Sequence, residues 1–185
     1  MTLLNDGATY EAASTGSGSG NYDAFLRLQA TRLEEGFNTD ANGNILDNKG
    51  GNFTHNLMFT DIEAVDISGT NYMELRLDVN EDNGDGDPLR LTEFKLWVSE
   101  EQADLVDYTG NGNFDSGFSL AFDLSGFLDL EDVNEGSGFD DYVFHIPMKA
   151  LEDAIATAGY NPAKVFVTLY SSFSAPIAVS RNGVF

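Results

Sequence analysis

The sequence predicts an all-β fold, a two-sheet β-sandwich with one short crossover helix near residues 147-158 and long acidic loops. Short apolar alternations recur roughly every ten to twenty residues, separated by clusters of Gly, Asn and Asp, which is typical of strands joined by turns. The 185 residues include 19 glycines and 31 acidic residues, and 42% of the chain is hydrophobic. That length and composition suit one globular domain with a real hydrophobic core.

Eight segments are predicted to be strands. In the third of them, apolar Met73 and Leu75 alternate with charged Glu74 and Arg76, which indicates one buried side and one side in water. In chain order the predicted strands are Ala24–Ala30, Leu57–Ile67, Tyr72–Val79, Leu91–Val98, Phe118–Leu124, Tyr142–Ile146, Val165–Ser171 and Ile177–Ser180.

One helix is predicted between the last strands. Pro147 suits the first helical position, Leu151 and Ile155 lie on one face of the helix, and Gly159 supplies a C-terminal stop. A second, short helical turn is expected at Glu100–Asp104.

The chain is predicted to hold a single ordered domain at residues 21-185. Residues 1-20 are expected to be flexible or weakly ordered, because they end in a Gly/Ser-rich run. The opening residues have neither the basic region nor the apolar region of a secretion signal. The chain also stops on apolar Val184 and Phe185, so we expect a piece of a longer protein.

The charge excludes two classes of partner. Nine basic residues against 31 acidic ones give a formal charge of −22, so we expect no nucleic acid partner and no binding to anionic membranes. No apolar run reaches the roughly 18–20 residues of a membrane span, so no membrane insertion is expected either. With no cysteine, the chain has neither disulfides nor thiolate metal sites.

The densest acidic cluster begins at Asp78. Asp78, Asn80 and Asp82 match the first three ligand positions of an EF-hand calcium loop, but the match fails at Asn83, where the EF-hand has glycine, and at Leu89, where it has glutamate. This spacing predicts a calcium loop of another kind; the alternative is a solvated acidic hairpin. The candidate ligands here are Asp78, Asn80, Asp82, Asp85 and Asp87.

Three further segments carry similar patterns. Asp40–Asp47 spaces oxygen-bearing side chains by two around a glycine, and Asp107–Asp115 is similar but also fits an ordinary Gly-Asn turn. Glu135–Asp141 ends in two adjacent carboxylates, which repel each other unless a cation or a donor satisfies them. We therefore expect several Ca²⁺ ions. The additional candidate ligands are Asp40, Asn42, Asn44, Asp47, Asp140 and Asp141, with Asp107, Asn111, Asn113 and Asp115 as weaker ones.

Enzymatic activity is not expected. His55 and His145, the only histidines, do not have a two-histidine metal spacing, and no nucleophile-elbow or phosphate-binding motif is present. Trp97 alternates out of phase with its apolar neighbours, which is compatible with an outward ring that stacks on a ligand but is better explained by half-buried packing on its strand. Together with Tyr108 and Tyr142 it leaves a carbohydrate-binding module open as an alternative.

Several stretches taken in order resemble a bacterial extracellular β-sandwich module, the peptide-binding domain in the ligand-binding region of repeats-in-toxin (RTX) adhesins. The resemblance runs from about Gly20 to the end of the chain. The stretches that carry it are Gly20–Gln29, Glu35–Asp40, Phe53–Leu57, Leu75–Glu81, Leu91–Trp97, Gly136–Gly138, Asp141–Val143 and Thr168–Ser171.

The resemblance implies a calcium-bound, extracellular cell-surface domain within a larger, type I-secreted adhesin. Such a domain captures short peptide ends on host or partner cells in a calcium-dependent way, and we expect the C-terminal carboxylate to be what it recognises. We expect the isolated domain to be monomeric. Two alternatives remain at this point, a carbohydrate-binding module and a purely structural, calcium-stabilised spacer.

Overall fold

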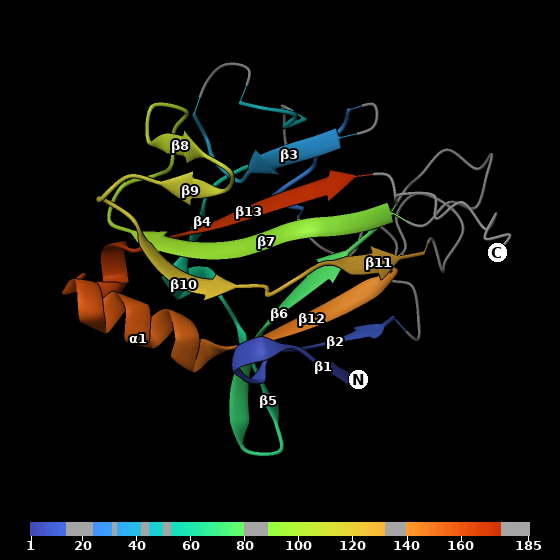
Figure 1. Ribbon diagram of the computed structural model, residues 1–185. Coiled ribbons are helices and arrows are strands. Elements are labelled where there is room, and N and C mark those ends of the chain that lie inside the picture. The colour runs from blue at the N-terminus through green and yellow to red at the C-terminus, as the bar shows by residue number, and fades with distance from the viewer. Residues whose placement is uncertain are drawn as a thin grey trace, which may run out of the picture.

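The structure, a computed structural model, describes residues 1–13, 24–30, 33–41, 45–49, 53–79, 89–131 and 140–174. Within them the chain is rich in antiparallel strands and contains one α-helix, and its two larger sheets form the layers of a β-sandwich (Figure 1). The predicted all-β architecture is therefore confirmed.

The smaller sheet has five strands, and every pairing in it is antiparallel. Its centre is the pair β12 and β6, in which Pro147 lies opposite Tyr72 and Tyr142 lies opposite Leu77. In spatial order the strands are β1 (Thr2–Leu3), β2 (Thr9–Ala12), β12 (Tyr142–Pro147), β6 (Thr70–Leu77) and β5 (Ala64–Ile67).

The larger sheet is built around β7 (Leu89–Ser99) and β13 (Phe166–Ser174). These two strands pair along almost their whole length, with an irregularity where Ser172 lies opposite Glu93 and Phe173 lies opposite Leu91, so that Thr92 is an extra residue on β7. The other strands of this sheet are β10 (Ser119–Asp123) and β11 (Leu128–Leu130), both beside β7, and β3 (Leu33–Phe37) and β4 (Leu57–Met58), both beside β13.

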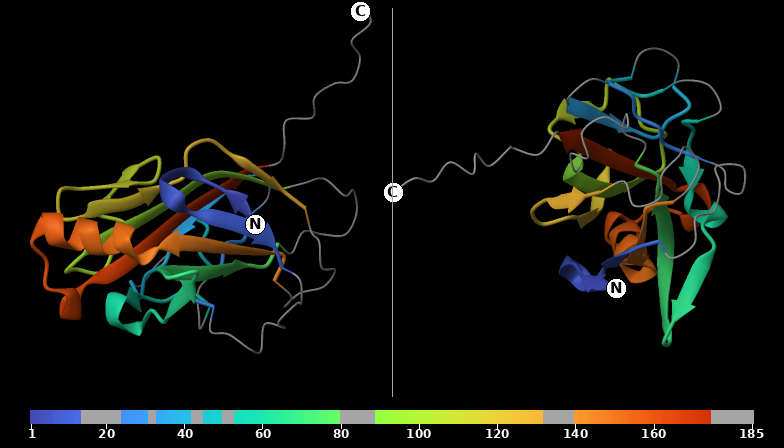
Figure 2. Two further views of the ribbon diagram at one scale, coloured as in Figure 1. Left: turned by 90° about the horizontal axis from the view of Figure 1, so that it is seen from below. Right: turned by 90° about the vertical axis from the view of Figure 1, so that its right-hand side faces the viewer.

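The two sheets enclose the main core. The rings of Phe94 on β7 and Phe144 on β12 stack across it with centroids 5.3 Å apart. The helix α1 (Met148–Ala158) closes one end of the sandwich with buried Leu151 and Ile155 (Figure 2). Gly159 ends the helix with a φ of 73°, as the sequence predicts, whereas Pro147 belongs to β12 and the helix begins one residue later.

A second core lies on the opposite face of the larger sheet. It is covered by a hairpin of β8 (Tyr108–Gly110) and β9 (Asn113–Phe114) that folds back over the sheet. Its buried members are Phe37, Ile45, Trp97, Ala103, Phe114, Phe118 and Tyr170. The larger sheet is therefore buried on both faces at this point.

Residues 1–13, where weak order was expected, contain the two strands β1 and β2. β1 and β2 pair with each other, β2 pairs with β12, and a 3-10 turn, Asn5–Gly7, connects them. Ala8 in this segment is fully buried against the main core. Residues 14–20 lie outside the described residues.

Most predicted strands are confirmed, but three predicted elements need correction, and a fourth lies outside the described residues. Ala24–Ala30 forms a single bridge, from Leu28 to Asn48, rather than a strand. Leu57–Ile67 is interrupted by a 3-10 turn, Phe59–Asp61, and so divides into β4 and β5. The predicted turn of helix at Glu100–Asp104 is absent from these described residues, and Ile177–Ser180 lies outside them.

Among the residues that the structure describes, no helix combines the length and the apolar character needed to cross a membrane.

Candidate functional site

Three of the predicted calcium ligands meet at one end of the smaller sheet. Asp78 follows β6 directly, and Asp140 and Asp141 directly precede β12. Because Leu77 pairs with Tyr142, the antiparallel register places residue 78 beside residues 140 and 141, although they are far apart in the sequence. We call this group the acidic end; it lies at the end of the sandwich opposite α1 (Figure 1).

The acidic end is buried and held by hydrogen bonds. Asp140 and Asp141 are both 0% exposed. Asp140 Oδ2 accepts a hydrogen bond from Arg76 Nη1 at 2.7 Å, and Asp141 Oδ2 accepts one from the backbone N–H of Val79 at 2.7 Å. Carboxylates are buried only where charges or donors compensate them, so these contacts fix the orientation of both groups.

Arg76 links the acidic end to the strand face beside it. Its guanidinium also donates to Glu74 Oε1, and the hydrogen bonds to Asp140 and then to Glu74 raise the pKa of Arg76. The cation therefore remains charged at any ordinary pH. On the same face, Nε2 of the buried His145 lies 3.4 Å from Glu74 Oε2, so this histidine is packed against the strand.

The described part of the acidic end does not by itself make up a calcium site. Calcium takes six to eight oxygen ligands. Within the described ranges, no group of three or more acidic or histidine side chains is arranged to hold a metal ion. The other candidates of this loop, Asn80, Asp82, Asp85 and Asp87, lie outside those ranges. A carboxylate accepts several bonds, so the contacts of Asp140 and Asp141 remain compatible with a cation as a further neighbour.

The Asp40–Asp47 loop is attached to β3 through Asp47. Asp47 Oδ2 accepts from the backbone N–H of Glu35 at 3.0 Å, and the backbone N–H of Asp47 donates to the carbonyl of Glu35. Asp40 is exposed, and Asn42 and Asn44 lie outside the described residues. In the described part of this loop, Asp47 therefore holds the loop against β3 by hydrogen bonds.

The weaker candidates between Asp107 and Asp115 make the contacts of ordinary turns. Asp107 Oδ2 accepts from the N–H of Asp104, and Asp115 Oδ1 accepts from the N–H of Gly117, each at 2.9 Å. The side-chain amide of Asn113 donates to the carbonyl of Asn111. These bonds are those of the Gly-Asn turn that the sequence left open as the alternative.

Trp97 is packed rather than exposed to solvent. It does lie on the face of β7 opposite the main core, but the β8–β9 hairpin covers it there, leaving it 8% exposed. Its indole N–H donates to the carbonyl of Gly112 in the hairpin at 3.1 Å. Tyr142 is likewise 8% exposed, and its hydroxyl accepts from the backbone N–H of Glu131. Two of the three aromatic residues that suggested a carbohydrate-binding module, Trp97 and Tyr142, are therefore covered.

A part-buried hydrogen bond joins β13 to β3 beneath the same hairpin. The Tyr170 hydroxyl donates to Glu35 Oε2 at 2.5 Å, and the Tyr108 hydroxyl lies 3.4 Å from both partners. Burial is the main cause that raises the pKa of Tyr170, and its hydrogen bond to Glu35 adds to the effect. Sequence reasoning missed this pair, because it joins residues 135 positions apart.

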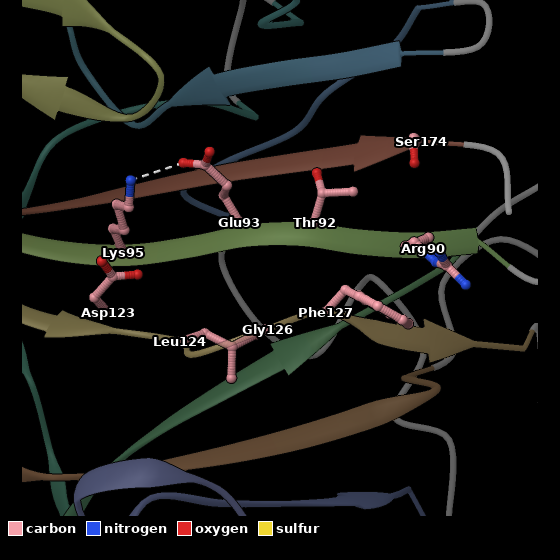
Figure 3. A pocket seen from close by; sticks show the side chains of 9 residues that line it. All are labelled: Arg90, Thr92, Glu93, Lys95, Asp123, Leu124, Gly126, Phe127 and Ser174. Carbon is pink, nitrogen blue, oxygen red and sulfur yellow. Dashed lines mark hydrogen bonds and ion pairs between the residues drawn. The ribbon is translucent and has the colours of Figure 1, made fainter. Parts of the chain in front are cut away.

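The structure adds a groove that the sequence did not indicate. It has a volume of about 530 Å³ and lies on the outer face of the larger sheet, along β7. Figure 3 shows its lining, from Lys95 and Asp123 at one end to Arg90 and Phe127 at the other. Because Thr92 is an extra residue on β7, the side chains of Thr92 and Glu93 both turn toward this face. A bulge of this kind cannot be recognised from the alternation of apolar and polar residues in the sequence.

Comparison with protein-family models, with curated proteins and with solved structures finds no match for this chain.

Proposed function

We propose that this protein is a calcium-dependent ligand-binding module of an adhesin, which captures short peptide ends by their C-terminal carboxylate. The proposal includes an extracellular, cell-surface location, a place within a larger chain, and a monomeric state for the isolated domain. The observation that carries it is the acidic end, where Asp78, Asp140 and Asp141 converge. The resemblance of the sequence to the peptide-binding domain of RTX adhesins points the same way.

The negative charge of the chain explains why binding a peptide carboxylate would require a cation. With a formal charge of −22, the protein repels an anionic peptide end. Asp140 and Asp141 add two buried carboxylates held in fixed orientations by Arg76 and by the backbone of Val79. Fixed oxygens of this kind suit calcium, whose positive charge would supply the attraction for a peptide carboxylate.

The role of each residue follows from its contacts. Asp140 and Asp141 would present oxygen ligands from the start of β12, and Asp78 would do so from the end of β6. Arg76 is a positioning residue, because it holds Asp140 from the neighbouring strand. Asn80, Asp82, Asp85 and Asp87 are proposed to complete the ligand set.

The test is binding to an array of peptides with free C-termini, in millimolar calcium and again with chelator, with amidated copies of the same peptides as the internal control. Binding that is lost both on chelation and on amidation supports the proposal. Equal binding of free and amidated peptides contradicts it. A domain that calcium stabilises but that binds no peptide would be a spacer.

Two isosteric variants connect the test to the acidic end. Asp140→Asn and Asp141→Asn keep the shape of the side chain and one acceptor oxygen but remove the charge. We therefore expect each variant to bind calcium at least about tenfold more weakly. Asp153→Asn is the matched control, because Asp153 pairs with Lys149 on the exposed face of α1. Circular dichroism checks that each variant is folded. Unchanged calcium affinity in both folded variants would remove Asp140 and Asp141 from the site.

A further inference from the structure

We propose that the groove along β7 is a second binding site, separate from the acidic end, and that its ligand is a neutral carbohydrate. The groove lies on the outer face of the larger sheet, whereas the acidic end belongs to the smaller sheet. Neither calcium nor a peptide end is proposed to bind in this groove.

The shape of the groove suits a short chain of sugars. Its floor follows β7 from Arg90 to Lys95, which at about 3.4 Å per residue extends roughly 17 Å. One wall is the end of β10 with the turn at Gly126, and the other includes Ser174 at the end of β13 (Figure 3). An extended trough on a sheet accommodates an oligosaccharide better than a compact cofactor.

An exposed aromatic ring marks one end of the groove. Phe127 is 56% exposed, and the guanidinium of Arg90 lies over its ring with its carbon 3.8 Å from the centroid. Arg90 in turn donates two hydrogen bonds to Asp129, at 2.6 and 2.9 Å. The ring is therefore held in place while much of it still faces solvent, which provides an apolar surface for the C–H face of a sugar.

The polar groups of the groove come as both donors and acceptors. Lys95 donates to Glu93 and to the carbonyl of Asn111, and the hydroxyl of Thr92 lies 2.9 Å from the carbonyl of Ser172. Asp123 is exposed beside Lys95. Sugar hydroxyls donate and accept at once, so mixed and ordered partners of this kind suit them.

The balance of charge argues against an anionic ligand. The cations Arg90 and Lys95 are each already paired with a carboxylate, Asp129 and Glu93 respectively, and Asp123 adds a third carboxylate. An anion would meet no unpaired cation among these residues and a strongly negative protein around them.

The turn that carries the ring is fixed before any ligand arrives. The side-chain amide of Asn5 donates to the carbonyl of Asp123 at 2.7 Å, and its oxygen accepts from the N–H of Ser125 at 3.2 Å. Gly126 then takes a φ of 95°, a conformation that favours glycine, and directs the chain to Phe127. A wall fixed in this way lowers the entropic cost of binding.

The experiment is an array of neutral and acidic oligosaccharides probed with the labelled protein, followed by calorimetry with the neutral oligosaccharide that gives the highest signal. We expect neutral glycans to bind, Phe127→Ala to weaken their binding about tenfold or more, and Asp123→Asn to weaken it several-fold. The control is Val106→Ala, which trims an even more exposed apolar side chain (86% exposed) outside the groove.

Each outcome decides the proposal. Binding of neutral glycans that Phe127→Ala weakens and Val106→Ala does not would support it. An array with no neutral hits, hits confined to acidic glycans, or a folded Phe127→Ala variant that binds like the unmodified protein would overturn it. The Phe127→Ala variant is also expected to retain calcium-dependent peptide capture, so failure here is distinct from failure of the proposed function.

Discussion

The hydrogen bond between Tyr170 and Glu35 offers a clean test of how side chains tie β13 to β3 in the larger sheet. Tyr170 is 1% exposed, and its hydroxyl lies 2.5 Å from Glu35 Oε2. Substitution by phenylalanine removes one oxygen atom and leaves the ring packing of Tyr170 against Tyr108 in place. The change in stability therefore reports chiefly this hydrogen bond, together with the longer contact of 3.4 Å from the Tyr108 hydroxyl.

The magnitude follows from the charge and the burial of the pair. A hydrogen bond to a charged group contributes about 1.5–3 kcal/mol to the free energy of unfolding. Since Glu35 is half-buried, we take the middle of that range, about 2 kcal/mol. For a domain of this size each kcal/mol shifts the melting temperature by about 2–4 °C, so we expect Tyr170→Phe to lower it by roughly 4–8 °C.

The measurement is urea unfolding and thermal melting at neutral pH, with Tyr160→Phe as the matched control. The Tyr160 hydroxyl also donates a hydrogen bond, to the carbonyl of Gly117 at 2.8 Å, but this contact is exposed and we expect it to contribute no more than about 1 kcal/mol. A double-mutant cycle with Glu35→Gln isolates the coupling. Equal effects of the two tyrosine substitutions, or no coupling in the cycle, would refute the reasoning.

Three further predictions follow from other contacts. The folded-state pKa values of Tyr142 and Tyr170 are raised, chiefly by burial, so their contribution to stability is present below the unfolded value of about 10 and is lost as the pH rises above it. Tyrosinate absorbance should therefore show these two of the seven tyrosines ionising only as the protein unfolds in alkali, and ionisation of all seven before unfolding would contradict this. Gly112→Ala should lower the melting temperature more than Gly159→Ala, because both positions have positive φ but a Cβ at Gly112 would lie 2.6 Å from the Tyr170 ring, whereas the position at Gly159 is open; equal shifts would contradict the close approach. Calcium at about a hundred times its dissociation constant should stabilise the domain by about 2.7 kcal/mol, and a melting temperature unchanged by chelator would exclude a calcium site of that kind.

The fold was predictable where alternation and burial agree. β6, β7, β10, β12 and β13 all coincide with predicted strands. β3 was missed because Glu34, Glu35 and Gly36 interrupt its apolar pattern, and it becomes a strand through pairing with β13. β1 and β2 were missed because they are short and owe their order to β12, a pairing that no local pattern shows.

The candidate site was predictable only as separate pieces. The adjacent carboxylates Asp140 and Asp141 could be singled out because two like charges need a partner, but their approach to Asp78 depends on the pairing of β6 with β12. The covering of Trp97 depends on the hairpin folding back over β7. The groove depends on the irregular register at Thr92. Each of these features depends on contacts between distant parts of the chain. The alternation of apolar and polar residues within one strand does not reveal such contacts.

The position of β13 has a consequence for folding kinetics. This strand fills the place between β7 and β3, and its contact with β3 spans 135 residues at Tyr170 and Glu35. The chain must close this long loop before the two strands can pair. We therefore expect slow folding, in the range of milliseconds to seconds that is typical of sandwiches dominated by non-local strand pairs. Until β13 arrives, the facing edge of β7 has unpaired N–H and C=O groups, and β7 is 11 residues long. The nascent chain is therefore most exposed to misassociation during that interval, and the surplus of negative charge would keep copies apart while it lasts.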